Sequence, residues 1–300
     1  MKAKDAANGK WRSVLTQLGI AEHALDGKHH PCPASGEGED RFRFADRNGS
    51  GNFFCNCSDG TKGGMALLMC CRSLSYVEAC KEVERVVGAA KDEPVKPKAD
   101  PRVALNRVRR LVRPAGDAVA AYLKGRGLIV PPGIKQARLT YWHNGKDLGA
   151  FDCMVGLIVS PADVPQSYHL TYLADGAKAD VPVSRKVMTP VDTVTGGAIR
   201  LFPPAEHMGI AEGIETAIAA HMLTGLPVWA AANANGVEKF VPPAECKRLT
   251  VFGDADETFT GQAAAFVLAK RAARAGFRCD VSLPPENGDW NDELQRRAAA

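Results

Sequence analysis

The sequence contains no long apolar run. Its N-terminus, MKAKDAANGKWRS, lacks the apolar segment of a secretory signal. No stretch approaches the ~20 apolar residues that a membrane-spanning helix needs. The nine cysteines are an odd number. We therefore expect a cytoplasmic protein with no membrane partner, in which cysteines serve more often as metal ligands or buried thiols than as disulfides.

Two common enzyme motifs are also missing. No G-x-x-x-x-G-K-[S/T] loop is present, which excludes a P-loop motor within this sequence. The N-terminal part has no G-x-S-x-G turn, which would present a serine nucleophile. The net charge of +4 says little about a nucleic-acid partner, so the local distribution of charge matters more. Basic residues are frequent over 102–138, whereas the candidate site near the C-terminus is acidic.

The first third of the chain predicts a small module and a linker. Residues 1–90 carry helical patterns around a glycine- and cysteine-bearing stretch, 29–64, and the apolar spacing from Leu67 to Val87 predicts one amphipathic helix. Residues 91–101 hold three prolines among alternating charges, which is typical of a linker.

The remaining two thirds change character near residue 205. Residues 102–204 combine a basic helix with strand-like runs, which predicts a mixed α+β region. From 205 to 300, apolar strands alternate with helical segments at 214–224 and 261–275. That alternation is the signature of an α/β domain with a parallel sheet and crossover helices.

Three cysteines in the first module lie among glycine, proline and serine, although cysteine is usually buried. Zinc takes four tetrahedral Cys or His ligands, usually as two close pairs. His29-x-x-Cys32 and Cys55-x-Cys57 form two such pairs; His29 has the better spacing of the two adjacent histidines, and His30 is the alternative. Between the pairs, RFRF and NFF alternate like strands, and two glycines, Gly49 and Gly51, can form the turn. The pattern predicts a zinc-bound β-module, whereas Cys70, Cys71 and Cys80 fall in a helical stretch and are expected to be core thiols.

Acidic residues follow two predicted strands in the last domain. Glu212 follows the apolar run MGIA, and Asp254 and Asp256 follow RLTVFG. Functional groups gather at the carboxyl ends of strands in an open parallel sheet, and residues two apart in extended backbone point the same way. Three converging carboxylates would repel one another, and a bound Mg²⁺ removes that cost. The ending GDWND adds Asp289 and Asp292 after the next strand, whereas Glu215 and Glu257 are expected to be helix caps or solvated turn residues.

These residues carry a resemblance to DNA primases of the phage and plasmid type. HHPCP (29–33), DRFRF (40–44) and GNFFCNC (51–57) resemble the zinc-binding domain of these primases, including the satellite-phage primase–helicases. The family commonly has Cys-Pro-x-Cys followed by CxxC. Here Ser35 replaces the second cysteine and the later pair is CxC, so the fourth ligand is assigned to a histidine.

The C-terminal motifs resemble the Toprim domain, which primases share with topoisomerases and some nucleases. They are Glu212-Gly213 and Asp254-x-Asp256, and the closing DWND (289–292) resembles the primase branch more narrowly. The middle region is similar to the segment that precedes Toprim in phage primases, through the runs AAYLKGRGL, YHLTYLADGAKADV and GGAIRLFPP.

The resemblance implies a nucleotidyltransferase that makes short RNA primers on a single-stranded DNA template during phage, plasmid or mobile-element replication in a bacterial host cell. It implies attack of a 3′-hydroxyl on the α-phosphate of a ribonucleoside triphosphate, with Glu212 in the catalytic step as general base. The candidate ligands of Mg²⁺, or of Mn²⁺ in its place, are Glu212, Asp254, Asp256 and Asp289. The candidate nucleic-acid or nucleotide contacts are Arg41, Arg43, Lys178, Arg185, Lys186 and Arg200. Phe42, Phe44, Phe53 and Phe54 are either base-stacking residues or the core of the zinc module.

Two other functions use part of the same residues. A Toprim nuclease would share the acids but not the zinc module with its RFRF run. A non-catalytic, zinc-dependent single-strand-binding adaptor would keep the N-terminal half and would not need the three acids. Because no P-loop is present, we expect any replicative helicase to be a separate partner.

Overall fold

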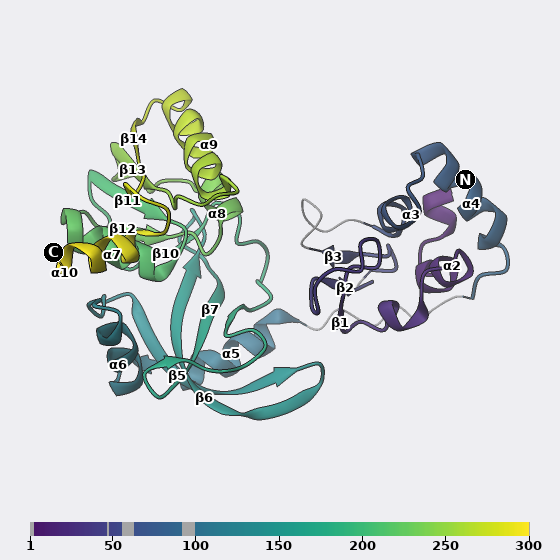
Figure 1. The fold of residues 1–300 in the computed structure, drawn as a ribbon, viewed down its shortest axis with the longest axis horizontal. Helices are drawn as coiled ribbons and strands as arrows, with labels where there is room; N and C mark the ends of the chain where they lie inside the picture. The colour runs from purple at the N-terminus through teal and green to yellow at the C-terminus, as the bar shows by residue number, and fades with distance from the viewer. Residues whose placement is uncertain (1–2, 47, 56–62, 92–99, 300) are drawn as a thin grey trace. The chain divides into compact units, whose positions relative to one another are not determined.

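The computed structural model describes residues 3–46, 48–55, 63–91 and 100–299. The chain divides into two compact units, Met1–Ala99 and Asp100–Ala300, called here the N-terminal and C-terminal units (Figure 1). Most of the expected linker, 92–99, and the expected zinc ligand Cys57 lie outside the described residues. Across the described ranges, no helix is long and apolar enough to cross a membrane.

The N-terminal unit places a small antiparallel sheet against short helices. The sheet runs in the order β1 (His29–His30), β2 (Phe42–Phe44) and β3 (Phe53–Cys55). The helices are α1 (Ala3–Ala6), α2 (Trp11–Gln17), the 3-10 helix η1 (Glu22–Leu25), α3 (Gly64–Arg72) and α4 (Tyr76–Val87). The alternation in RFRF and NFF therefore forms strands as predicted, and Gly49 and Gly51 take the positive φ angles that glycine tolerates.

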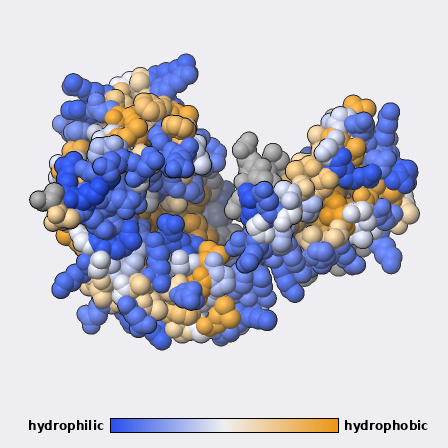
Figure 2. Space-filling view, viewed as in Figure 1, coloured by the Kyte–Doolittle hydropathy of each residue, from blue (hydrophilic) through white to orange (hydrophobic). Residues whose placement is uncertain are grey.

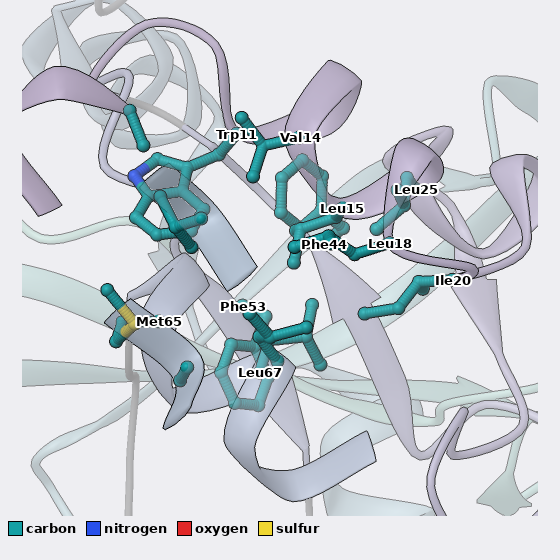
Figure 3. Close-up of a cluster of buried hydrophobic side chains, with 14 of the residues drawn as sticks. Trp11, Val14, Leu15, Leu18, Ile20, Leu25, Phe44, Phe53, Met65 and Leu67 are labelled. Carbon is teal, nitrogen blue, oxygen red and sulfur yellow. The ribbon is translucent and has the colours of Figure 1, made fainter. Parts of the chain in front are cut away.

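Aromatic side chains from the sheet fill the core of this unit. Phe42, Phe44 and Phe53 are at most 3% exposed, and Figure 3 shows Phe44 and Phe53 among the side chains of Trp11, Leu15 and Leu67. Large apolar side chains of this kind contribute ~2 kcal/mol or more each when buried. Three of the four candidate stacking phenylalanines are therefore core residues.

The single helix predicted from Leu67 to Val87 is wrong, because two helices occupy that span. Ser73 ends α3 in a left-handed conformation with φ of 51°. Ser75 then begins α4 with a capping box, in which its side chain accepts from the Glu78 N–H and the Glu78 carboxylate accepts from the Ser75 N–H. Cys71 and Cys80 pack against the core as expected, but Cys70 is exposed.

The first part of the C-terminal unit is a meander of long antiparallel strands. β5 (Ile134–His143), β6 (Lys146–Val159) and β7 (Pro165–Ala174) pair in that order. Short strands extend this sheet and two helices pack on it: β4 (Arg113–Pro114), β8 (Ala177–Lys178), β9 (Arg185–Val187), β10 (Ala198–Ile199), α5 (Pro101–Leu111) and α6 (Asp117–Gly125). This region is mixed α+β, as the sequence predicts.

The second part is a parallel α/β layer joined to the same sheet through β10. Its strand order is β14 (Arg278–Ser282), β13 (Arg248–Phe252), β11 (His207–Ala211) and β12 (Val228–Ala230), all parallel. The crossover and terminal helices are α7 (Ile214–Thr224), α8 (Ala234–Lys239), α9 (Thr260–Arg274) and α10 (Trp290–Ala299).

Helices cover both faces of these parallel strands. Phe252 and Ala211 face the cluster that contains Ile214 and Trp290, from α7 and α10. Alternate strand residues such as Val251 face the cluster formed by α8 and α9. The strands are apolar throughout because both faces are buried. The surface visible in Figure 2 is mainly hydrophilic, with small scattered apolar patches.

Candidate active site and metal sites

The expected acidic residues lie along one edge of the parallel sheet. β11 and β13 are neighbours with Ala211 opposite Phe252. Glu212 follows the first strand directly, and Asp254 follows the second after Gly253. Trp290 of α10 donates from Nε1 to the Gly253 carbonyl at 3.2 Å, which fixes the turn that presents Asp254.

Asp254 is held in an environment that opposes its negative charge. Its Oδ1 is buried and has no hydrogen-bond partner among the described residues. Burial, and then the negative charges of Glu212, Asp289, Asp256 and Asp292, raise the pKa of Asp254 from 3.8 to about 7. A buried, unpartnered carboxylate oxygen under the influence of other negative charges is expected where a cation is to bind.

Glu212 shares this environment in a milder form. Burial and the charge of Asp256 raise the pKa of Glu212, although the positive charge of Arg185 opposes the rise. A carboxylate with a raised pKa is a better proton acceptor than an ordinary one. Arg185 lies in β9, far along the sequence from Glu212, so the fold brings one expected cation to this edge.

Two of the acids cap helices. Asp256 accepts hydrogen bonds from the backbone N–H groups of Thr258, Thr260 and Gly261 at 2.9–3.2 Å, and the Thr258 hydroxyl also donates to it. These bonds, led by the one from the Thr258 side chain, lower the pKa of Asp256. Asp289 accepts from the N–H groups of Asn291 and Asp292 at the start of α10.

The donor set fits a hard divalent cation. As they stand, no three His, Cys, Asp or Glu side chains in the described part of the chain are grouped closely enough to hold a metal ion. Yet the unpartnered Oδ1 of Asp254 and the mutual repulsion of the acids match the carboxylate preference of Mg²⁺. A bound cation would supply the charge that this edge lacks.

The expected cations differ in what surrounds them. Lys178 and Arg185 act on the pKa of Glu215, and Arg185 also acts on that of Glu212. Lys186 instead lies 3.5 Å from the centroid of the Tyr141 ring and donates to the Trp142 carbonyl at 2.8 Å.

Arg200 is held in a similar way to Lys186. It pairs with Asp163 and lies 4.9 Å from the Trp229 ring centroid. The contacts of both Lys186 and Arg200 tie them to the fold.

The expectation that Glu215 is solvated is wrong, although it does lie in the first turn of α7. Glu215 is only 6% exposed. The sequence contains a signal for this burial, because IETAIAA is apolar on every side of a helix, and such a helix is surrounded by protein. Glu257 is exposed, as expected.

The candidate zinc ligands Cys32 and Cys55 lie at one end of the small sheet. Cys32 follows the end of β1, and Cys55 is the last residue of β3. Both are 2% exposed. A tight turn follows Cys32, in which Gly36 donates to the Cys32 carbonyl at 2.7 Å and the Cys32 N–H donates to Glu37 at 3.0 Å. These bonds fix the backbone at Cys32.

The two adjacent histidines point to opposite faces of this sheet. His30 lies opposite Phe42, which lies opposite Cys55. Residues directly opposite one another share a face, so His30 lies on the buried face with Cys55. His30 and Cys32 also line the same open cavity of about 740 Å³, and His30 Nε2 bonds Asp26 Oδ1 at 2.7 Å.

His29 lies on the other face, in register with Arg43 and Phe54. Phe54 is 50% exposed, and the Arg43 guanidinium donates to the Gly27 carbonyl at 2.9 Å. Arg41 pairs with Glu37 at 2.8 Å. An exposed aromatic ring beside cationic groups is the arrangement that stacks and neutralises single-stranded nucleic acid.

Comparison with known proteins identifies the two terminal domains. Residues 27–64 match the zinc-binding domain of primase-helicase, and residues 207–300 match the Toprim domain. Residues 99–201 match a domain of unknown function. The chain therefore combines a primase-type zinc-binding domain with a Toprim domain, as its motifs predict, and this combination supports a primase function.

Solved primase structures are similar to this chain at low sequence identity. A DNA primase domain from Pseudomonas aeruginosa is 16% identical, with 61% of this chain and 68% of that one covered and a TM-score of 0.42. The primase fragment of the bacteriophage T7 primase-helicase protein is 14% identical, with 91% and 97% covered and a TM-score of 0.40. The Aquifex aeolicus primase, comprising zinc-binding and RNA polymerase domains, is 16% identical, with 87% and 73% covered and a TM-score of 0.42.

Proposed function

We propose that this chain is a DNA primase that joins ribonucleoside triphosphates on a single-stranded DNA template. The observation that carries the proposal is the environment of Asp254. Its Oδ1 is buried and unpartnered among the described residues, and burial together with the charge of Glu212 at the adjacent strand end raises its pKa to about 7. A carboxylate in this state suits a site that gains a cation and phosphate groups together.

Each residue of the candidate active site has a separate proposed role. Asp254 and Asp256 would bind the divalent cation, with Glu212 and Asp289 as further candidate ligands. The cation, when bound, neutralises the charge that develops on the transferred phosphate. Glu212, with its raised pKa, accepts the proton of the attacking 3′-hydroxyl. Arg185 and Lys178 contact the triphosphate, because they are the described cations that act electrostatically on Glu212 and its neighbour Glu215.

In this proposal the N-terminal unit binds Zn²⁺ and selects the template site. Cys32, Cys55 and Cys57 would supply thiolates, and His30 would supply the fourth ligand. Asp26 holds the other ring nitrogen, as a carboxylate commonly does for a zinc-bound histidine. Zinc organises the module, whose exposed face carries Arg43 and Phe54.

A primer-synthesis assay tests the function. Purified protein is incubated with single-stranded DNA, the four ribonucleotides and Mg²⁺, and the products are resolved by length. Short labelled RNA that depends on both template and Mg²⁺ supports the proposal. Cleavage of the DNA without RNA synthesis would make the chain a nuclease. Binding of the DNA without either product would make it an adaptor.

A further inference from the structure

A buried carboxylate stands one helical turn beyond Glu212. Glu215 belongs to the first turn of α7, where its neighbours Ile214, Ala217 and Ile218 are buried apolar residues. An ionised carboxylate in such surroundings is costly unless it is paired. The groups that pair with the Glu215 carboxylate therefore explain how it can be buried.

Two groups from the first part of the C-terminal unit converge on one oxygen of Glu215. The Tyr122 hydroxyl, in α6, donates to Oε1 at 2.6 Å. The Lys178 ammonium, in β8, lies 3.5 Å from the same oxygen. The short bond is therefore to the tyrosine, while the lysine is attracted to the carboxylate over a longer distance.

Glu215 is ionised despite its burial. Burial raises its pKa, but the Tyr122 hydrogen bond and then the positive charges of Lys178 and Arg185 outweigh that effect, so the pKa is lowered overall. His169 contributes no positive charge near neutral pH, because burial lowers its pKa to about 4. The cluster therefore holds one negative and two positive charges.

Lys178 and Arg185 both have hydrogen-bond donors left to bind a further anion. Lys178 has three donors, its side chain is 33% exposed, and the 3.5 Å contact leaves them available. Arg185 makes no side-chain hydrogen bond or ion pair with the residues that the structure describes, and its charge acts on both Glu215 and Glu212. Both cations lie near the start of α7, Lys178 against Glu215 and Arg185 close enough to act on Glu212 and Glu215 alike.

We propose that Glu215 is a positioning residue that holds Lys178 at the start of α7, the helix that follows Glu212, so that Lys178 together with Arg185 receives the triphosphate of the incoming nucleotide, and that Tyr122 fixes Glu215 for this purpose. The inference rests on the proposed primase function. Glu215 does not touch the reacting atoms. It acts through Lys178, so its removal impairs nucleotide binding more than the chemical step.

The test measures KM for ribonucleotides, kcat and binding of labelled ATP by equilibrium dialysis in full-length protein. The variants are Glu215→Gln, Tyr122→Phe, Lys178→Met and the double variant Glu215→Gln/Lys178→Met. Glu245→Gln makes the same chemical change at an exposed position and serves as the control. Thermal unfolding is recorded for every protein.

We expect Glu215→Gln and Tyr122→Phe each to raise KM and weaken ATP binding about fivefold, the effect of one lost net hydrogen bond, with kcat within about twofold. In the Lys178→Met background, Glu215→Gln adds little, because both changes remove the same interaction. Tyr122→Phe deletes one hydroxyl and keeps the fold. If Glu215→Gln unfolds, the KM and ATP affinity of Tyr122→Phe test the inference instead.

Two results would overturn the inference while leaving the function standing. One is an unchanged KM with only a lower melting temperature. The other is a double variant whose KM rises by the product of the two single-variant increases, which would mean that Glu215 and Lys178 act independently. A wild-type protein that neither makes primers nor binds ATP would overturn the proposed function, and the inference with it.

Discussion

Glu212 and Asp254 follow adjacent parallel strands, and the negative charge of Glu212 is, after burial, the largest cause of the raised pKa of Asp254. The two carboxylates come from positions more than forty residues apart in the sequence. Their repulsion is a property of the fold that a bound cation would relieve, so the free protein and the metal-bound protein should respond differently to pH and to substitution.

Asp254→Asn should stabilise the metal-free protein above neutral pH. Because the folded pKa is raised from 3.8 to about 7, folding is favoured by protonation of Asp254. That contribution is fully present below pH 3.8 and is lost as the pH rises through about 7. Each pKa unit corresponds to roughly 1.4 kcal/mol, so Asn should add a few kcal/mol to the free energy of unfolding at pH 8.

Thermal unfolding with a chelator at pH 5 and pH 8 measures this effect. The free energy of unfolding should fall more between pH 5 and pH 8 in the wild type than in Asp254→Asn. Equal losses in the two proteins would show that Asp254 ionises normally in the folded chain. Asp256→Asn is the contrasting variant, because the hydrogen bonds that lower the pKa of Asp256 stabilise its charged form.

Zinc binding should depend on His30 more than on His29. Elemental analysis should find one zinc ion per chain, and Cys55→Ser should release it, because the site then lacks one of its thiolate ligands. His30→Ala should weaken zinc binding in a competition with a chromophoric chelator, and His29→Ala should not. Absence of zinc from the wild type would remove the site altogether, and the reverse order of the two histidines would reassign the fourth ligand.

Phe54→Ala should reduce binding of single-stranded DNA without unfolding the N-terminal unit. The ring is 50% exposed, and stacking on a base is worth about 1–3 kcal/mol. Phe42→Ala is the matched contrast, since Phe42 is fully buried and its loss should cost about 3–5 kcal/mol of stability. Fluorescence anisotropy with labelled DNA measures the first effect and thermal unfolding the second. Unchanged DNA affinity in Phe54→Ala would exclude this face from template contact.

Local patterns in the sequence were sufficient to predict the strands and the acidic edge. Glu212 and Asp254 follow apolar runs that are buried on both faces, and parallel strands leave their carboxyl ends together. Residues two apart in an extended chain point to the same side, so the sequence also offers His30 as the histidine on the side of Cys32. The expected pairing of His29 with Cys32 rests on their spacing along the sequence, and the choice between His29 and His30 stays a prediction.

Long-range contacts could not be predicted in the same way. The partners of the buried Glu215 carboxylate, Tyr122 and Lys178, reach it from α6 and β8. The break between α3 and α4 depends on one left-handed serine and a capping box within a continuous apolar pattern. A tertiary contact in the first case and a single backbone angle in the second determine the structure, and neither can be read from the spacing of apolar residues.

Incorporation of labelled ribonucleotide into short oligomers on single-stranded DNA tests the central claim most directly. Glu212→Gln should lower the rate by about 10²–10⁴-fold, as expected for loss of a general base, and Asp254→Asn and Asp256→Asn by at least as much. Glu212→Gln should still bind Mg²⁺ more readily than the two Asp variants, and Glu245→Gln should match the wild type. Substantial primer synthesis by both Asp254→Asn and Asp256→Asn would contradict the assignment of this acidic edge as the active site.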